Sequence, residues 1–225
     1  MRWRRHAFEA CGDDRYSRPG LGDMERKLER RLPARGFFVE AGAHDGFSQS
    51  NTYFLERFCG WSGLLVEPVP ELYRAAVKER PASQVINCAL VSPEEAGHPV
   101  RIHHAGLMSI VAGARGDAAA DRAYLAAAGA LPFAVEQYDV EVPGRTLSEL
   151  LDELGSPAVD FLSLDLEGYE LEALAGLDFA RHAPAHILLE AHDDPALAAL
   201  EAQLGDEYEV ADRIPPNDVL YIRRG

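Results

Sequence analysis

Positive charge is scarce in this chain of 225 residues. Lysine and arginine together number 22 against 37 aspartate and glutamate residues, so the formal net charge is −15 at pH 7. Nucleic-acid backbones and anionic membrane surfaces attract proteins that carry an excess of lysine and arginine. The composition therefore predicts that neither is a partner, and it favours a small neutral or cationic substrate.

Cysteines and long apolar runs are also few. Cys11, Cys59 and Cys88 are odd in number and show no Cys-x-x-Cys spacing, which predicts neither a disulfide framework nor a zinc site. No run of 18 apolar residues occurs, and the basic N-terminus is followed by no apolar segment of signal-peptide length. We therefore expect a cytoplasmic protein without a membrane anchor.

The length and the 47% hydrophobic content suit one α/β domain better than two. Within a single domain over 1–225, we expect an N-terminal helical segment at 1–35. Residues 92–143 interrupt the alternation of strands and helices with an expected loop, an alanine-rich helix near 118–128 and a further polar stretch. A connection of this length is usually functional, so we expect a lid or substrate wall there. A homodimer is compatible with this composition.

Residues 36–68 form the most informative stretch, because they predict a strand, a glycine turn, a helix and a second strand. The first strand ends at Glu40, Gly42 and Gly46 permit a tight turn, and the second strand ends at Glu67. Ligands of parallel α/β sheets bind where strands end and helices begin. The two glutamates and the turn between them are therefore expected to line one crevice, with a nucleoside-containing cofactor as its occupant.

The turn lacks two of the three glycines that a dinucleotide fingerprint requires. Counted from Gly42, the second and third positions are occupied by His44 and Phe47. Glu40 and Asp45 would repel a pyrophosphate, but they suit a ligand that carries an ammonium and a sulfonium group, such as S-adenosylmethionine. The alternative is that these two carboxylates only cap and solvate the turn.

The remaining cofactor contacts are expected at the next strand ends. Glu67 can accept hydrogen bonds from both ribose hydroxyls, as the corresponding acid does in dinucleotide folds. Asn87 and Ala89 fall near the end of a third strand, expected at 83–91, where an adenine ring would lie. An ordinary buried strand terminus is the alternative interpretation of this pair.

The second half of the chain continues the alternation of strands and helices. Strands are expected at 160–170 and 186–192, and two β-prone runs at 207–210 and 219–224 end the chain. This order predicts an α/β, Rossmann-like, doubly wound sheet that is mostly parallel, with an antiparallel C-terminal edge strand.

A second acidic cluster lies at the ends of the later strands. Asp165 and Glu167 are two residues apart and point the same way, as do Glu190 and His192. A hydroxyl that accepts a methyl group must lose its proton to a positioned base, and His192 is the best candidate by intrinsic pKa. His192 or Glu167 could instead cap the helix that follows, and Asp165 could bind the cofactor ammonium. The candidate catalytic residues are His192, Asp165 and Glu167.

The same cluster allows a metal as an alternative. Asp165, Glu190 and His192 offer oxygen and nitrogen ligands at neighbouring strand ends, which would suit Mg²⁺ or Mn²⁺ holding a substrate oxygen.

With these residues assembled, the sequence resembles the FkbM-type family of S-adenosylmethionine-dependent methyltransferases over about 16–223. The resemblance is carried by FFVEAGAHDGFSQSNTYFLE, GWSGLLVEPVPELY, INCALVS, DFLSLDLEGYELEALAGLDF and ILLEAH. It implies a seven-stranded class I methyltransferase fold and methyl transfer to a hydroxyl of a sugar or secondary metabolite. Glu40, Ala41 and His44 stand where the family more usually has Asp, a β-branched residue and Asn. The candidate cofactor-binding residues are Glu40, Gly42, Ala43, Asp45, Gly46, Asn51, Glu67, Pro68, Asn87 and Ala89.

Two other functions fit parts of the pattern. One is an NAD-dependent oxidoreductase on a similar fold, which the missing glycines disfavour. The other is a non-catalytic nucleoside-binding domain, which the clustered carboxylates disfavour because they are costly in a crevice without a ligand to neutralise them. Methylation of a nitrogen instead of an oxygen would leave the same sequence pattern.

Overall fold

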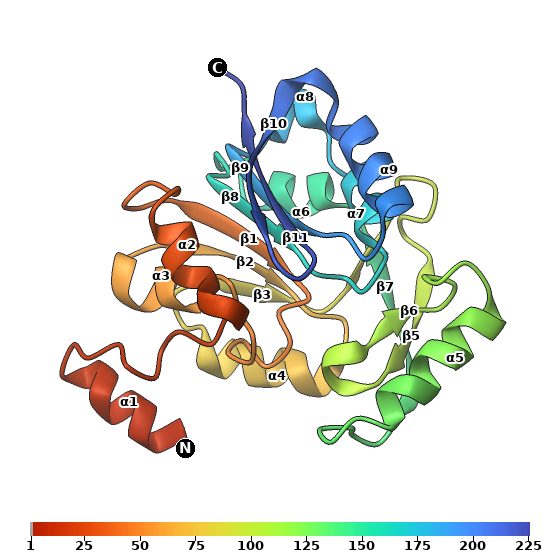
Figure 1. Ribbon diagram of the computed structural model, residues 1–225, viewed down its shortest axis with the longest axis horizontal. Coiled ribbons are helices and arrows are strands. Elements are labelled where there is room, and N and C mark those ends of the chain that lie inside the picture. The colour runs from red at the N-terminus through yellow and green to blue at the C-terminus, as the bar shows by residue number, and fades with distance from the viewer. Residues whose placement is uncertain (1) are drawn as a thin grey trace.

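The computed structural model describes residues 2–225 and contains a seven-stranded sheet with the order β10-β11-β9-β8-β1-β2-β3 (Figure 1). Strands β1, β2, β3, β8 and β9 run parallel, and β11 runs antiparallel to both of its neighbours. The strands are β1 Phe37–Ala41, β2 Ser62–Val66, β3 Gln84–Ile86, β8 Phe161–Leu164, β9 His186–Glu190, β10 Tyr208–Ile214 and β11 Asp218–Arg223.

This sheet confirms the predicted fold class of a mostly parallel sheet with an antiparallel C-terminal strand. The antiparallel strand β11 lies one position in from the edge, because β10 pairs outside it. The chain leaves β1 toward β2 on one side and later returns to place β8 on the other side. The strand order therefore reverses between β1 and β8, and ligands of open α/β sheets bind beside such a reversal.

The inner strands β1, β2, β8 and β9 are buried on both faces, which explains their nearly continuous apolar sequences. Phe38 packs on one face with Met24 and Leu28, whereas its neighbour Val39 packs on the other with Leu150. Helices α2 and α3 cover the first face and α6, α7 and α9 cover the second (Figure 1). The helices of the main domain are α2 Met24–Glu29, α3 Tyr53–Cys59, α4 Pro70–Glu79, α6 Leu147–Glu153, α7 Glu170–Ala175, α8 Phe179–His182 and α9 Asp194–Leu204.

Local sequence signals account for several helix ends. Thr146 and Glu149 form a reciprocal capping box at the start of α6, and Asp193 accepts the backbone N–H of Ala196 at the start of α9. The helix expected to begin after Asn51 starts at Tyr53, where the Ser50 hydroxyl accepts the backbone N–H.

The N-terminal segment contains one helix more than the sequence pattern predicts. Within the helical segment expected at 1–35, helix α1, Arg2–Ala10, precedes α2 and packs through buried polar groups rather than an apolar stripe. Glu9 accepts hydrogen bonds from the hydroxyls of Ser17 (2.7 Å) and Tyr53 (2.8 Å), and Arg5 pairs with Glu79. Because these contacts link residues far apart in sequence, no periodicity could have revealed them.

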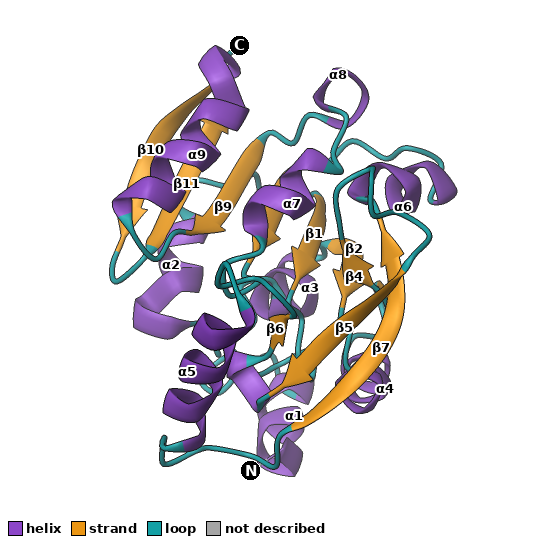
Figure 2. Cartoon of the chain, turned by 90° about the vertical axis from the view of Figure 1, so that its right-hand side faces the viewer, coloured by secondary structure: helices purple, strands orange, loops and turns teal. Residues whose placement is uncertain are grey.

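The insertion folds as a second, four-stranded sheet with the order β4-β7-β5-β6, seen at the front right of Figure 2. The expectation of loop and polar chain over 92–143 was therefore wrong at β5 and β7, which pair antiparallel, whereas the alanine-rich helix is confirmed as α5. The strand expected at 83–91 splits, because β4 leaves the main sheet to pair with β7. The elements are β4 Ala89–Leu90, β5 Pro99–His104, β6 Ile110–Val111, α5 Ala118–Gly129 and β7 Tyr138–Arg145.

Over residues 2–225, none of the helices combines the length and the apolar character needed to cross a membrane.

Candidate active site

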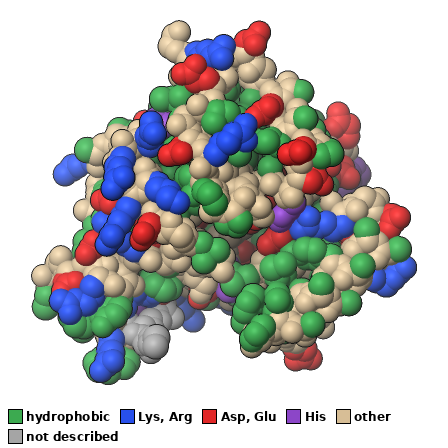
Figure 3. All heavy atoms as spheres, in the orientation of Figure 1, with side chains coloured by type: hydrophobic (Ala, Val, Ile, Leu, Met, Phe, Trp, Pro, Cys, Tyr) green, Lys and Arg blue, Asp and Glu red, His purple; other side chains and the backbone are tan. Residues whose placement is uncertain are grey.

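A cavity of about 460 Å³ opens at the C-terminal ends of β1, β2, β8 and β9, between the main sheet and the insertion. On the face shown in Figure 3, acidic and histidine side chains gather beside the hydrophobic insertion at the lower right. Of the predicted site residues, those that line the cavity are Gly42, Asn51, Glu67, Pro68, Ala89, Asp165, Glu167, Glu190 and His192. The structure thus places Glu67 and the second acidic cluster in the wall of one cavity.

Glu67 lies at the end of β2 with both carboxylate oxygens fixed by the backbone. Oε1 accepts the N–H of Val69 (2.8 Å) and Oε2 accepts the N–H of His44 (2.7 Å). Each oxygen keeps a second lone pair, so two further donors can bind from the cavity. Burial raises the pKa of Glu67 to about 7 despite these hydrogen bonds, and a ligand that donates to the carboxylate would offset this cost.

Glu40 does not line the cavity, so its predicted contact with the cofactor has no direct support in this geometry. Its carboxylate is buried and accepts the N–H of Asn51 (2.7 Å) and the hydroxyls of Ser50 (2.9 Å) and Thr52 (2.5 Å). The guanidinium of Arg80 lies 3.3 Å from the same carboxylate. Glu40 therefore fixes the segment between the turn and α3, and it can act on a cofactor only through that segment.

Asp45 is also absent from the cavity wall, and its geometry matches the turn-capping alternative. Its Oδ1 accepts the backbone N–H groups of Phe47 (3.0 Å) and Ser48 (2.6 Å). Burial alone would raise its pKa, but the hydrogen bonds from His44, Ser48 and Phe47 outweigh burial and hold the pKa well below its ordinary value. Asp45 therefore stays ionised and shapes the turn.

Three other residues that were predicted to bind the cofactor do not line the cavity but pack behind its wall. Ala43 is buried in the apolar core on the α3 face, and Gly46 packs its backbone against Ala76 of α4. The Asn87 amide donates to the carbonyls of Glu67 (2.9 Å) and Pro68 (2.7 Å), so it shapes the segment after β2. In this geometry they support the residues that do line the cavity, and a direct contact with the cofactor stays a prediction.

Carboxylates from three neighbouring strands meet at the far end of the cavity. Asp165 follows β8, Glu190 ends β9, and Asp218 begins β11 directly opposite Glu190. Burial and the neighbouring carboxylates, Glu190 first, raise the pKa of Asp165 well above its ordinary value. Burial likewise raises the pKa of Glu190 to about 7 and that of Asp218 to about 6. The site therefore holds carboxyl groups able to exchange protons near neutral pH.

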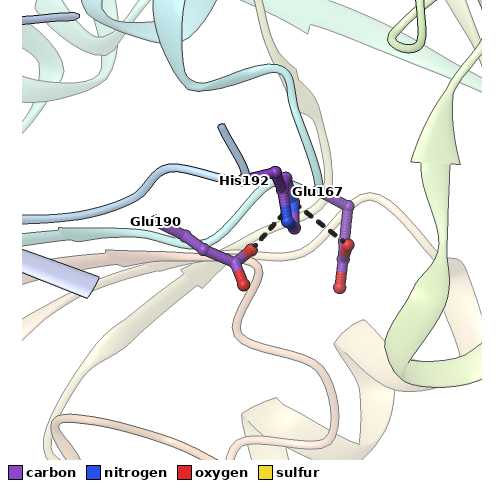
Figure 4. Close-up of side chains that lie close together, drawn as sticks. All are labelled: Glu167, Glu190 and His192. Carbon is purple, nitrogen blue, oxygen red and sulfur yellow. Dashed lines mark ion pairs between the residues drawn. The ribbon is translucent and has the colours of Figure 1, made fainter. Parts of the chain in front are cut away.

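His192 lies between two of the acidic side chains, as Figure 4 shows. Its Nε2 is 3.2 Å from Glu190 Oε2 and 3.5 Å from Glu167 Oε2. Burial, followed by the positive charge of Arg115, lowers the pKa of His192 below its ordinary value. The imidazole is therefore mostly neutral at pH 7 and can accept a proton.

The metal-ligand geometry differs from the predicted set. Glu167, Glu190 and His192 offer ligand atoms within 4.8 Å of one another, whereas Asp165, which the sequence suggested, is not part of this group. Glu167 has a positive φ of 53°, which turns its side chain toward His192 and was not visible from the sequence.

Several cavity residues escaped the sequence analysis. Tyr124 lies on the alanine-rich helix α5 and Phe133 lies after it, and nothing in the sequence pattern marked either side chain as facing a site. Asp218 could have been found, because the start of an antiparallel strand lies at the same sheet edge as the ends of its parallel neighbours.

Buried carboxyl groups predict that the ligand-free protein loses stability as the pH rises. Glu67 and Glu170 have an ordinary pKa of 4.5 and a folded pKa of about 7, both raised first by burial. Their contribution is fully present below the unfolded pKa and is lost as the pH rises through 7. We expect each to lower the free energy of unfolding by roughly 1 kcal/mol between about pH 6.5 and about pH 8. Urea unfolding measures this slope, which Glu67→Gln should reduce; an unchanged slope would contradict the assignment.

The chain is similar to one described protein family and, at low sequence identity, to several solved structures. The family model described as "Methyltransferase FkbM domain" matches residues 40–208. No curated protein matches the chain significantly. Among solved structures, a TehB-like SAM-dependent methyltransferase from Corynebacterium glutamicum has a TM-score of 0.45 at 12% identity, covering 99% of this chain and 96% of that chain. A human methyltransferase 10 domain containing protein has a TM-score of 0.41 at 10% identity, covering 83% of this chain and 70% of that chain.

Proposed function

Because this chain belongs to the FkbM family of S-adenosylmethionine-dependent methyltransferases, we propose that it methylates a hydroxyl group of a small molecule such as a sugar or secondary metabolite. The observation that carries the proposal is the cavity, which has Glu67 at one end and a proton-accepting cluster at the other. The first suits the ribose of the methyl donor and the second suits a hydroxyl that must lose its proton.

The cavity wall supports a neutral or cationic acceptor rather than an anionic one. Among the described residues that line it there is no lysine or arginine, and the carboxylates are Glu67, Asp165, Glu167, Glu190 and Asp218. The methyl donor brings one net positive charge, so most of this negative charge would face the acceptor. Leu107, Met108 and Phe133 supply apolar surface from the insertion, which suits a molecule with both hydroxyl and apolar faces.

Methyl transfer in this site would follow a direct displacement. The acceptor oxygen forms a bond to the methyl carbon, the bond from that carbon to sulfur breaks, and the electron pair of that bond stays on the sulfur. The hydroxyl proton passes to His192 or to one of the neighbouring carboxylates, of which Glu190 has a pKa of about 7. Holding the two reactants in line can lower the barrier by about 7 to 11 kcal/mol, so positioning provides most of the acceleration.

A methyl-transfer assay tests the proposal. The protein is incubated with donor labelled in the methyl group and with panels of hydroxyl-bearing and amine-bearing sugars and polyketides, and labelled products are identified by mass spectrometry. Transfer to an oxygen supports the proposal. Transfer only to nitrogen would refute O-methylation, and calorimetric binding of NAD⁺ without binding of the methyl donor would refute the cofactor.

Replacing His192 by alanine should spare donor binding and slow turnover. We expect kcat to fall about tenfold, a modest value for a general base because Glu190 remains as a proton acceptor. His98→Ala provides the control, since His98 is exposed and lies outside the cavity wall. Single-turnover kinetics of both variants measure the effect, and an unchanged rate in His192→Ala would remove His192 from the mechanism.

A further inference from the structure

Arg115 is the basic residue that the insertion presents to the acidic cluster, although it lies outside the cavity wall. It sits in the turn between β6 and α5, and this turn is held by buried Asp121. One carboxylate oxygen of Asp121 accepts the backbone N–H of Gly113 (2.6 Å) and the other accepts that of Arg115 (3.1 Å). The backbone of Arg115 is therefore held in place independently of the contacts that its side chain makes.

The side chain of Arg115 reaches two of the three candidate metal ligands. Its Nη2 donates to Glu167 Oε2 (3.1 Å) and lies 3.4 Å from His192 Nε2. The guanidinium carbon lies 4.1 Å from the ring centroid of Tyr124, and the Tyr124 hydroxyl donates to the same Glu167 oxygen (2.6 Å). The insertion thus supplies Glu167 with a cation from the turn before α5 and with a hydroxyl from α5 itself.

These contacts occupy one of the two Glu167 oxygens that a divalent metal could bind. A carboxylate oxygen has two lone pairs, and both lone pairs of Glu167 Oε2 already face donors, Arg115 and Tyr124. This oxygen also lies 3.5 Å from His192 Nε2, on the side of Glu167 where a metal shared with His192 would bind. A metal bound to it would have to displace one of the two donors and would be repelled by the guanidinium charge.

We propose that Arg115 is the permanent cation of the cluster formed by Glu167, Glu190 and His192, so that this site works without a divalent metal. In this role Arg115 is a positioning residue: it neutralises Glu167, orients His192 and leaves Glu190 and Asp165 to face the acceptor. The catalytic part of this inference rests on the proposed function, whereas the exclusion of metal can be tested on the protein alone.

Manganese binding provides that test, measured by electron paramagnetic resonance on the full chain without donor or acceptor. The unmodified protein should show no Mn²⁺ site that depends on Glu190. Arg115→Ala should gain one, so that this variant binds Mn²⁺ at least about tenfold more tightly than the unmodified protein does, and the double variant R115A/E190Q should lose it again. Arg115→Lys, which keeps a cation, should gain none.

Two outcomes would overturn the proposal. One is a Mn²⁺ site in the unmodified protein that Glu190→Gln abolishes. The other is the absence of any gain in Mn²⁺ binding in a folded Arg115→Ala variant. Folding is checked by circular dichroism, and Arg115→Gln is used in its place if the alanine variant unfolds.

A second readout is turnover, which should be insensitive to EDTA and should be lower in Arg115→Gln than in Arg115→Lys. A protein that binds no manganese and transfers no methyl group would refute the proposed function but not the exclusion of metal.

Discussion

Replacing Gly42 by alanine should destabilise the protein by about 4 kcal/mol or more and abolish binding of the methyl donor. Gly42 has a φ of +80°, and a Cβ atom built there would lie 2.0 Å from the carbonyl oxygen of Asp165. That oxygen belongs to the backbone at the end of β8, so it cannot rotate away as a side chain could. Either β1 and β8 must separate or the turn must move, and both changes disrupt the cavity wall. Urea unfolding and calorimetry with the donor measure the two effects.

Gly97→Ala is the matched control for this prediction. Gly97 has the same φ of +80°, but no other heavy atom lies within 4 Å of the position that a Cβ atom would occupy. Its replacement isolates the backbone strain of a left-handed alanine, about 1 to 2 kcal/mol. If the two variants lost equal stability, the contact between Gly42 and Asp165 would not be as close as the structure has it.

Replacing Glu67 by alanine should weaken binding of the methyl donor about 100-fold. The carboxylate can accept hydrogen bonds from both ribose hydroxyls, and each bond to a charged acceptor contributes about 1.5 to 3 kcal/mol. Loss of two such bonds corresponds to at least about 3 kcal/mol, hence the expected factor. Isothermal titration calorimetry with the donor measures the dissociation constant.

Glu40→Ala separates direct contact from structural support. Glu40 is equally buried and lies near the end of β1 in the same βαβ unit, but its carboxylate faces Arg80 and the segment before α3. Its loss should lower the free energy of unfolding by about 3 to 5 kcal/mol, because the buried guanidinium of Arg80 then has one carboxylate fewer to neutralise its charge. Donor affinity in the folded fraction should change less than tenfold. A larger loss of affinity in Glu40→Ala than in Glu67→Ala would reverse our assignment of the two residues.

The main sheet could be predicted because its inner strands β1, β2, β8 and β9 are buried on both faces and appear in the sequence as apolar runs followed by acids. The same logic placed Glu67, Asp165, Glu190 and His192 at one edge, since parallel strands bring their carboxyl ends together. What the pattern could not reveal is the direction in which a carboxylate points within a turn. Glu40 and Asp45 have the residue type and position of ligand contacts. Their carboxylates instead accept hydrogen bonds from nearby backbone N–H groups.

The insertion was largely hidden from sequence reasoning for a different reason. Strands β5 and β7 carry apolar residues only at short alternating positions, Val100 and Ile102 in β5 and Val140 and Val142 in β7, and the residues between them are accessible to solvent. An alternation this short, flanked by proline and glycine, is easily taken for a loop. Their pairing joins segments about 40 residues apart, which no local pattern encodes. Arg115 and Tyr124 reach Glu167 only after this pairing forms, and the acceptor side of the site was therefore the part least open to prediction.

A crystal structure of the protein with the demethylated cofactor would test the central claim most directly. Our account predicts both ribose hydroxyls within hydrogen-bonding distance of Glu67, and the sulfur facing the carboxylates of Asp165 and Glu190. A ribose bound elsewhere, or a sulfur turned away from those carboxylates, would contradict it.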